Sequence, residues 1–363
     1  FWAASKDGTN PVSGKPNFKN PSNCNYQLSI SSAAIDAGAL SFSDGYNAPI
    51  KDLRGYYRVG TPDLGAYEAG ASKSILAMAD DGGGIHNSGS LTLTNTEVSG
   101  NTAANNGGGI RVSSSGTAEI IGSTFNGNTA TGDGGGINNG GTLTLTDSEV
   151  NGNTAFDDAG GINISSSGTA TVTDRVIDGN IASDVGGGIY NLGTLNLTRS
   201  AVSNNTTPDA GGGIRISSSG VADVSGSAIN DNTANGVSGD GGGISNIGTL
   251  TLTNTTMTGN VATDKGGGIR ASNGSTLTLT NVTMNLNEAS DGGGLYINTL
   301  GSISLLNTIV ADSVTGGDCS GTVISLGNNL DSDNTCGLTG PGDLSGLDPL
   351  LNPLQDNGGP PFT

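Results

Sequence analysis

The sequence predicts an all-β chain folded as a right-handed parallel β-helix, a solenoid of about nine rungs with non-repetitive segments at both ends. A Gly-Gly-Gly-Ile signal recurs every 25 to 30 residues, a strand of alternating apolar and polar residues follows each signal, and an asparagine recurs at a fixed place after it. Only 33% of the 363 residues are hydrophobic and 64 are glycine. This composition suits a solenoid, since its core is a thin column along one axis.

The Gly-rich signal opens each repeat and fixes its period. In the early rungs the spacing alternates between 25 and 27 residues, so equivalent positions lie 52 residues apart, which indicates duplication of a two-rung unit. Glycine is expected at this corner because the chain turns where no Cβ fits. The signal ends at Ile85, Ile110, Ile137, Ile162, Ile189, Ile214, Ile244, Ile269 and Leu295.

The second segment of each rung is an alternating strand such as Thr-Leu-Thr-Leu-Thr at residues 142–146. Because side chains alternate between the two faces of a strand, the aliphatic ones are expected to point inward and stack from rung to rung. One inward row is predicted to contain Leu91, Ala118, Leu143, Ala170, Leu195, Ala222 and Leu250. The other is predicted to contain Leu93, Ile120, Leu145, Val172, Leu197, Val224, Leu252, Leu279 and Leu305.

The third segment is a short apolar-x-x-Asn run, which completes an expected three strands and three turns per rung. Asparagine tolerates the left-handed conformation of tight corners, and amides stacked about 4.8 Å apart can form a hydrogen-bonded ladder. The predicted ladder consists of Asn101, Asn128, Asn153, Asn180, Asn205, Asn232, Asn260 and Asn287.

This pairing of motifs over residues 82–312 resembles the repeat of the chlamydial polymorphic outer membrane proteins, in which a Gly-Gly-Ala-aliphatic motif accompanies Phe-x-x-Asn. Only Phe125–Asn128 has the phenylalanine, so the likeness is to the wider class of bacterial β-helix surface proteins. The resemblance implies a right-handed β-helix displayed outside the cell, with adhesive or structural functions and no catalytic residue.

The two ends resemble parts of the choice-of-anchor β-helix proteins, in reversed order. Residues 31–38 and 52–68, with Asp63-Leu-Gly-Ala-Tyr-Glu68, are similar to that family's tail, although Ala34 stands where the family usually has proline. Residues 319–360 are similar to the closing segment that normally precedes the tail. We therefore expect a tail or cap-like module at 1–75 that docks on a neighbouring unit, helix repeats at 76–312 and a closing segment at 313–363. The alternative is a monomer whose first 70 residues fold back as a cap.

The charge balance limits the partners of the chain. Its formal net charge is −19 and its pI is about 4.1, so a nucleic acid or an anionic membrane surface is disfavoured. No stretch approaches the roughly 18 apolar residues of a membrane span, and no insertion of this segment is expected. The chain opens with Phe1 and shows no signal peptide, which indicates either processing or a piece of a longer protein.

The three cysteines favour an oxidising compartment. Cys319 and Cys336 lie in one Gly/Asn/Asp-rich segment and could close a small loop, or both could stay reduced and buried. Cys24 is left over, which leaves a free thiol or a bond to another chain.

No residue is assigned a catalytic, cofactor-binding or metal-binding role. His86 is the only histidine, and Arg111, Asn138, Asn163, Tyr190 and Arg215 replace it in sister rungs, which indicates an exposed position. Short loops leave no wall for a sugar cleft, and Arg111, Arg215 and Arg270 lie on separate rungs. We therefore expect no enzyme.

Aspartates gather at the Gly-rich corner. Asp81, Asp133, Asp240 and Asp291 precede the triplet directly, Asp158 precedes its Ala159 variant, and Asp184, Asp209 and Asp264 stand one residue earlier. The simpler interpretation is that aspartate solvates the turn. Ca²⁺ remains open as a cofactor, because it would relieve repulsion between stacked carboxylates.

Together these features predict a structural extracellular or cell-surface protein whose partners are copies of itself, joined head to tail in a filament or tandem array. A monomeric adhesin-like module that binds a surface or glycan is the first alternative. A polysaccharide-active enzyme is the second. Rows of outward threonines such as Thr92 and Thr144 raise ice binding, but Glu119, Asn196 and Asp223 interrupt them.

Overall fold

The computed structural model describes residues 18–20, 25–28, 80–272, 274–298 and 302–352. The chain divides into two compact units, Phe1–Ala77 and Met78–Thr363. In the first, β1 (Phe18–Asn20) pairs antiparallel with β2 (Asn25–Leu28). The rest of the predicted 1–75 module, Cys24 included, lies outside the described residues.

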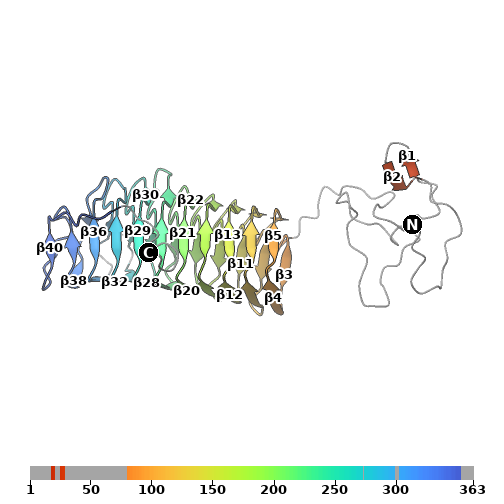
Figure 1. Cartoon of the computed structure of the whole chain (residues 1–363), viewed down its shortest axis with the longest axis horizontal. Helices are drawn as coiled ribbons and strands as arrows, with labels where there is room; N and C mark the ends of the chain where they lie inside the picture. Colours follow the sequence, from red (N-terminus) through yellow and green to blue (C-terminus); the bar gives the residue numbers. More distant parts are fainter. Residues whose placement is uncertain (1–17, 21–24, 29–79, 273, 299–301, 353–363) are drawn as a thin grey trace. The chain divides into compact units, whose positions relative to one another are not determined.

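The second unit is a parallel β-solenoid of about nine turns, which confirms the predicted fold class. Figure 1 shows equivalent strands of successive coils side by side along its axis. Most coils contain four strands, not the expected three, because a two-residue strand follows the ladder asparagine. The coil of β7, β8, β9 and β10 is an example, with β10 pairing in parallel with the same strand of the coils before and after it.

The strands form four parallel sheets, numbered here by their order along a coil. Sheet 1 contains β3 (Ile85–Asn87), β7 (Ile110–Val112), β11 (Ile137–Asn139), β15 (Ile162–Ile164), β19 (Ile189–Asn191), β23 (Ile214–Ile216), β27 (Ile244–Asn246), β31 (Ile269–Ala271), β34 (Leu295–Ile297) and β37 (Cys319–Ser320). Sheet 2 contains β4 (Ser90–Thr94), β8 (Thr117–Ile121), β12 (Thr142–Thr146), β16 (Thr169–Thr173), β20 (Thr194–Thr198), β24 (Val221–Ser225), β28 (Thr249–Thr253), β32 (Thr276–Thr280), β35 (Ser302–Leu306) and β38 (Ile324–Gly327).

The other two sheets are built from the shorter strands. Sheet 3 contains β5 (Glu97–Ser99), β9 (Thr124–Asn126), β13 (Glu149–Asn151), β17 (Val176–Asp178), β21 (Ala201–Ser203), β25 (Ala228–Asn230), β29 (Thr256–Thr258), β33 (Thr283–Asn285), β36 (Ile309–Ala311), β39 (Leu330–Asp331) and β40 (Leu344–Ser345). Sheet 4 contains β6 (Thr102–Ala103), β10 (Thr129–Ala130), β14 (Thr154–Ala155), β18 (Ile181–Ala182), β22 (Thr206–Thr207), β26 (Thr233–Ala234) and β30 (Val261–Ala262).

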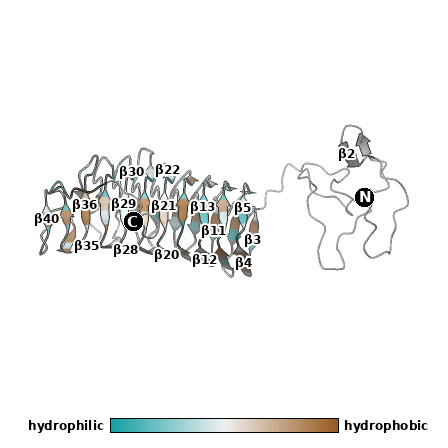
Figure 2. Ribbon diagram, in the orientation of Figure 1, coloured by the Kyte–Doolittle hydropathy of each residue, from teal (hydrophilic) through white to brown (hydrophobic). Residues whose placement is uncertain are grey.

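The predicted inward rows form the core. In sheet 2, Leu143 pairs with Ala118 on one side and Ala170 on the other, so large and small side chains alternate along the column. All members of both rows are buried except Leu91 and Leu93, which are half-buried in the first coil because no earlier coil covers them among the described residues. Hydrophobic residues, brown in Figure 2, occur along the strands of these columns.

The asparagine ladder also forms as predicted. Each amide donates to the Oδ1 of the next coil at 2.9 or 3.0 Å, from Asn101 through to Asn287. The left-handed conformation, however, was assigned to the wrong residue. It lies one position earlier, for example at Gly127 (φ 61°) and Asn204 (φ 53°), which leaves the ladder side chain free to turn inward.

The Gly-rich corner lacks room for side chains. A Cβ on Gly187, the second glycine of its triplet, would lie 2.5 Å from the carbonyl oxygen of Gly212 in the next coil. At the third position, a Cβ on Gly109 would lie 3.1 Å from Nδ2 of Asn128, so the ladder packs directly against this corner. The expectation that no Cβ fits there is confirmed, apart from Ala159 at a first position (φ 58°).

The closing segment continues the solenoid beyond residue 312. β37, β38 and β39 extend sheets 1, 2 and 3, and β40 adds a further strand to sheet 3. A polar network ends the core column, in which Asp343 accepts hydrogen bonds from Ser325 and from the backbone of Asn329. Within the described residues, no helix has the length and apolar character that crossing a bilayer requires.

Cys319 and Cys336 form the disulfide that the spacing suggested, with their Cα atoms 4.7 Å apart. Both are buried. The bond closes a loop over a sequence separation of 17 residues, so Cys336→Ser is expected to lower the free energy of unfolding by about 3 kcal/mol. Thermal melts with and without reductant test this expectation. Reductant should lower the melting temperature of the wild type only, and an unchanged wild-type melt would contradict it.

Candidate functional site

The outer face of sheet 1 has one row of polar and charged side chains. Register places His86, Arg111, Asn138, Asn163, Tyr190, Arg215, Ser245, Arg270 and Tyr296 on neighbouring strands. His86 is exposed, as expected. The sister positions are not uniformly exposed, which corrects the sequence interpretation: Asn138, Asn163 and Ser245 are buried, because side chains and loops of the acidic corner lie against them.

Charges are paired at the far part of this row. Arg270 lies 3.0 Å from Asp240, and Lys265 lies 2.5 Å from Asp264 and 5.7 Å from the ring centre of Tyr296. Burial raises the pKa of Asp240 and lowers that of Arg215, which the neighbouring charge of Arg270 lowers further. These groups belong to different coils, and the three arginines proposed to line one face lie on β7, β23 and β31.

Three carboxylates meet at the near part of the corner. One oxygen from each of Asp133, Asp157 and Asp158 lies within 4.8 Å of the other two. Burial raises the pKa of Asp133, and burial together with the charges of Asp133 and Asp157 raises the pKa of Asp158 to about 7. The other predicted corner aspartates, including Asp81, Asp184, Asp209 and Asp291, do not join this group.

Asp157 and Asn163 were not singled out from the sequence as members of a site. The pair Asp157-Asp158 stands one coil after Asp133, and the 25-residue period would have placed the three together. The position of Asn163 has no comparable signal. Its burial depends on how the corner loop crosses the sheet, which the repeat pattern does not specify.

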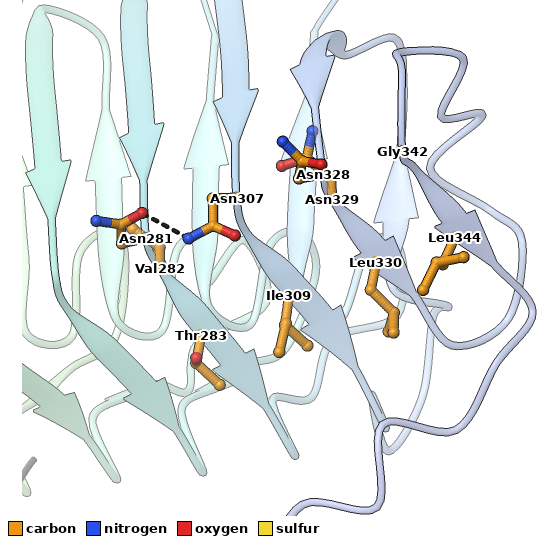
Figure 3. A pocket seen from close by; sticks show the side chains of 10 residues that line it. All are labelled: Asn281, Val282, Thr283, Asn307, Ile309, Asn328, Asn329, Leu330, Gly342 and Leu344. Carbon is orange, nitrogen blue, oxygen red and sulfur yellow. Dashed lines mark hydrogen bonds between the residues drawn. The ribbon is translucent and has the colours of Figure 1, made fainter.

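The C-terminal end of the solenoid has a pocket of about 430 Å³ on the outer face of sheet 3. Register aligns Thr283, Ile309, Leu330 and Leu344 across four successive strands, and Figure 3 shows these side chains along the pocket. The earlier strands of sheet 3 have polar or smaller residues at this position, such as Glu97 in β5. The apolar end row is defined here as Ile309, Leu330 and Leu344.

Further exposed aliphatic side chains surround the apolar end row in sequence. Ile324, Leu326, Leu347 and Leu350 are each at least half exposed. An amide row borders the pocket, where Asn307 donates to Asn281 at 2.7 Å (Figure 3). The free edge of β40 has no strand partner among the described residues. Exposed apolar surface beside an unpaired edge is typical of a contact site for another protein segment.

Comparison with known proteins gives no relative for this chain, since no protein-family model, curated protein sequence or solved structure matches it.

Proposed function

We propose that the chain is a structural, extracellular or cell-surface unit of a head-to-tail assembly. In this assembly the N-terminal segment of one unit, residues 1–75, covers the C-terminal end of the next solenoid. The supporting observation is the apolar end row with its pocket and the free edge of β40. A solenoid needs its ends covered, since an open end exposes apolar surface and unpaired backbone.

The order of the segments favours this arrangement. The resemblance of residues 319–360 to a closing segment, and of residues 31–68 to the tail that normally follows one, makes the tail of a second unit the occupant of this end. A contact between different surfaces of identical units does not close into a dimer, and it continues into a linear filament when the rotation leaves the ring open. A tandem array of covalently joined units uses the same contact.

Charge at the end surface is expected to prevent assembly. Leu344 is 49% exposed in β40, so Leu344→Glu introduces a carboxylate into the proposed contact without burying it in the isolated unit. The cost of desolvating that charge should weaken association by roughly tenfold or more. Ile181→Glu is the matched control, because Ile181 is an aliphatic residue of the same exposed fraction, 49%, in the middle of the solenoid.

Sedimentation velocity over a range of concentrations measures this effect. The wild type and Ile181→Glu should form species that grow with concentration, and Leu344→Glu should remain a monomer. A wild type that stays monomeric throughout would instead support the cap or adhesin-like alternative, in which residues 1–75 cover an end of their own chain.

A further inference from the structure

The strongest unassigned feature of the described residues is the carboxylate group of Asp133, Asp157 and Asp158. Two coils contribute to it, and their backbones hold it together. The amide of Asp158 donates to Asp133 Oδ1 at 3.4 Å, and Asp158 Oδ1 accepts from the amide of Val185 at 3.3 Å. The stacking of coils therefore brings these carboxylates together whether or not they repel one another.

A buried amide points into the group. Asn163, in β15, is 3% exposed, and its Nδ2 donates to Asp133 Oδ2 at 3.1 Å. Its Oδ1 is buried and has no hydrogen-bond partner, which is costly for a carbonyl oxygen. A half-turn of the amide would place Oδ1 beside Asp133 Oδ2, at a separation suited to two oxygens that each lie about 2.4 Å from one cation.

The neighbouring cations do not neutralise this group. Within the described part of the chain, none of the three carboxylates forms an ion pair with lysine or arginine, whereas Asp240 and Asp264 on the same corner each have one. Arg111 is the nearest cation by its influence on Asp133, but its Nη1 donates to Asn138. The group therefore holds more negative charge than its own surroundings offset.

We propose that Asp133, Asp157 and Asp158, with the carbonyl oxygen of Asn163, bind a divalent cation of the Ca²⁺ class. Ca²⁺ accepts six to eight oxygen ligands in flexible geometry, so three carboxylates and one amide carbonyl form a partial set that water completes on the exposed side of Asp157. Sites of this kind in extracellular modules bind with dissociation constants of about 0.1–1 mM.

The titration of Asp158 gives the site a dependence on pH. The facing groups are Asp133, Asp157, Asp184 and Tyr190, with Arg111 beside Asp133. Since the folded-state pKa, about 7, lies above the ordinary value of 3.8, protonation stabilises the folded chain at low pH, and this stability is lost as pH rises through 7. Cation binding should lower the pKa of Asp158 and release about half a proton at pH 7.

The test uses the full chain after chelation, with thermal melts in CaCl₂ and in MgCl₂ and with isothermal titration calorimetry in two buffers of different ionisation enthalpy. At pH 8, 10 mM CaCl₂ should raise the melting temperature of the wild type by roughly 3 °C, with less effect from MgCl₂. Calorimetry should show one site and the proton release.

Asp158→Asn should abolish the calcium shift and the proton release. It should still fold, and without metal its melting temperature at pH 8 should equal or exceed that of the wild type, because one repelling charge is gone. Asp291→Asn, which also changes an aspartate directly before a triplet, is the matched control and should keep the calcium shift. A wild type without a shift, or an equal shift in Asp158→Asn, would overturn the proposal.

Discussion

Asn180→Ala is expected to lower the free energy of unfolding by about 4 kcal/mol, one of the two largest effects of any single substitution in the described core. The Asn180 side chain makes four hydrogen bonds. Its Nδ2 donates to Val150 O at 2.8 Å and to Asn205 Oδ1 at 2.9 Å. Its Oδ1 accepts from the backbone N–H and the Nδ2 of Asn153, at 3.0 and 2.9 Å.

Alanine at this position would leave two donors of Asn153 and the carbonyl of Val150 without partners in a place where water does not reach, since Asn153 and Asn180 are fully buried. Each unsatisfied buried group costs about 1–3 kcal/mol. Urea titration of the purified chain measures the loss. Asn196→Ala is the matched control, because Asn196 is exposed on β20, and it should change the value by no more than about 0.5 kcal/mol. Equal losses in both variants would show that the ladder does not stabilise the fold.

Gly187→Ala is expected to cost about 3 kcal/mol or more through steric overlap. The added Cβ would lie 2.5 Å from the Gly212 carbonyl oxygen and 2.7 Å from backbone atoms of Thr206, and neither backbone can move without shifting its own coil. The φ angle of Gly187 is not in the left-handed region, so the predicted loss comes from the close approach of coils.

Gly89→Ala is the control for this substitution, since a Cβ there meets no atom within 4 Å. Its melting temperature should match that of the wild type. Gly187→Ala should melt at a temperature lower by several degrees, given that about 1 kcal/mol corresponds to roughly 2–4 °C in a chain of this size. If both variants melted alike, the coils would have to be further apart at this corner than the structure places them.

The repeat pattern was sufficient to predict the core because it involves one residue type at one spacing. Period-two alternation identified the inward positions of sheet 2, and the fixed Gly and Asn positions identified two corners. The bond between Cys319 and Cys336 followed from their shared segment. Those features depend on local sequence and on the stacking of equivalent positions, both of which are visible without coordinates.

Other features depend on the path of the chain in three dimensions. The strands of sheet 4, such as β10, have two residues, which is too short for an alternating pattern to show. The left-handed position before each ladder asparagine is occupied by Gly, Asn, Asp or even Leu286 (φ 54°), so no single residue type marks it. The burial of Asn163 follows from the route of a neighbouring loop, and so does the meeting of three carboxylates beside it.

Electron microscopy of the purified chain at increasing concentration tests the central claim most directly, namely that the open end of one solenoid receives a second copy. Nine turns at about 4.8 Å each extend for roughly 43 Å. We expect linear filaments with an axial repeat somewhat longer than this, because the end segments add to it. Separate short rods at every concentration would contradict the assembly and leave only the solenoid itself.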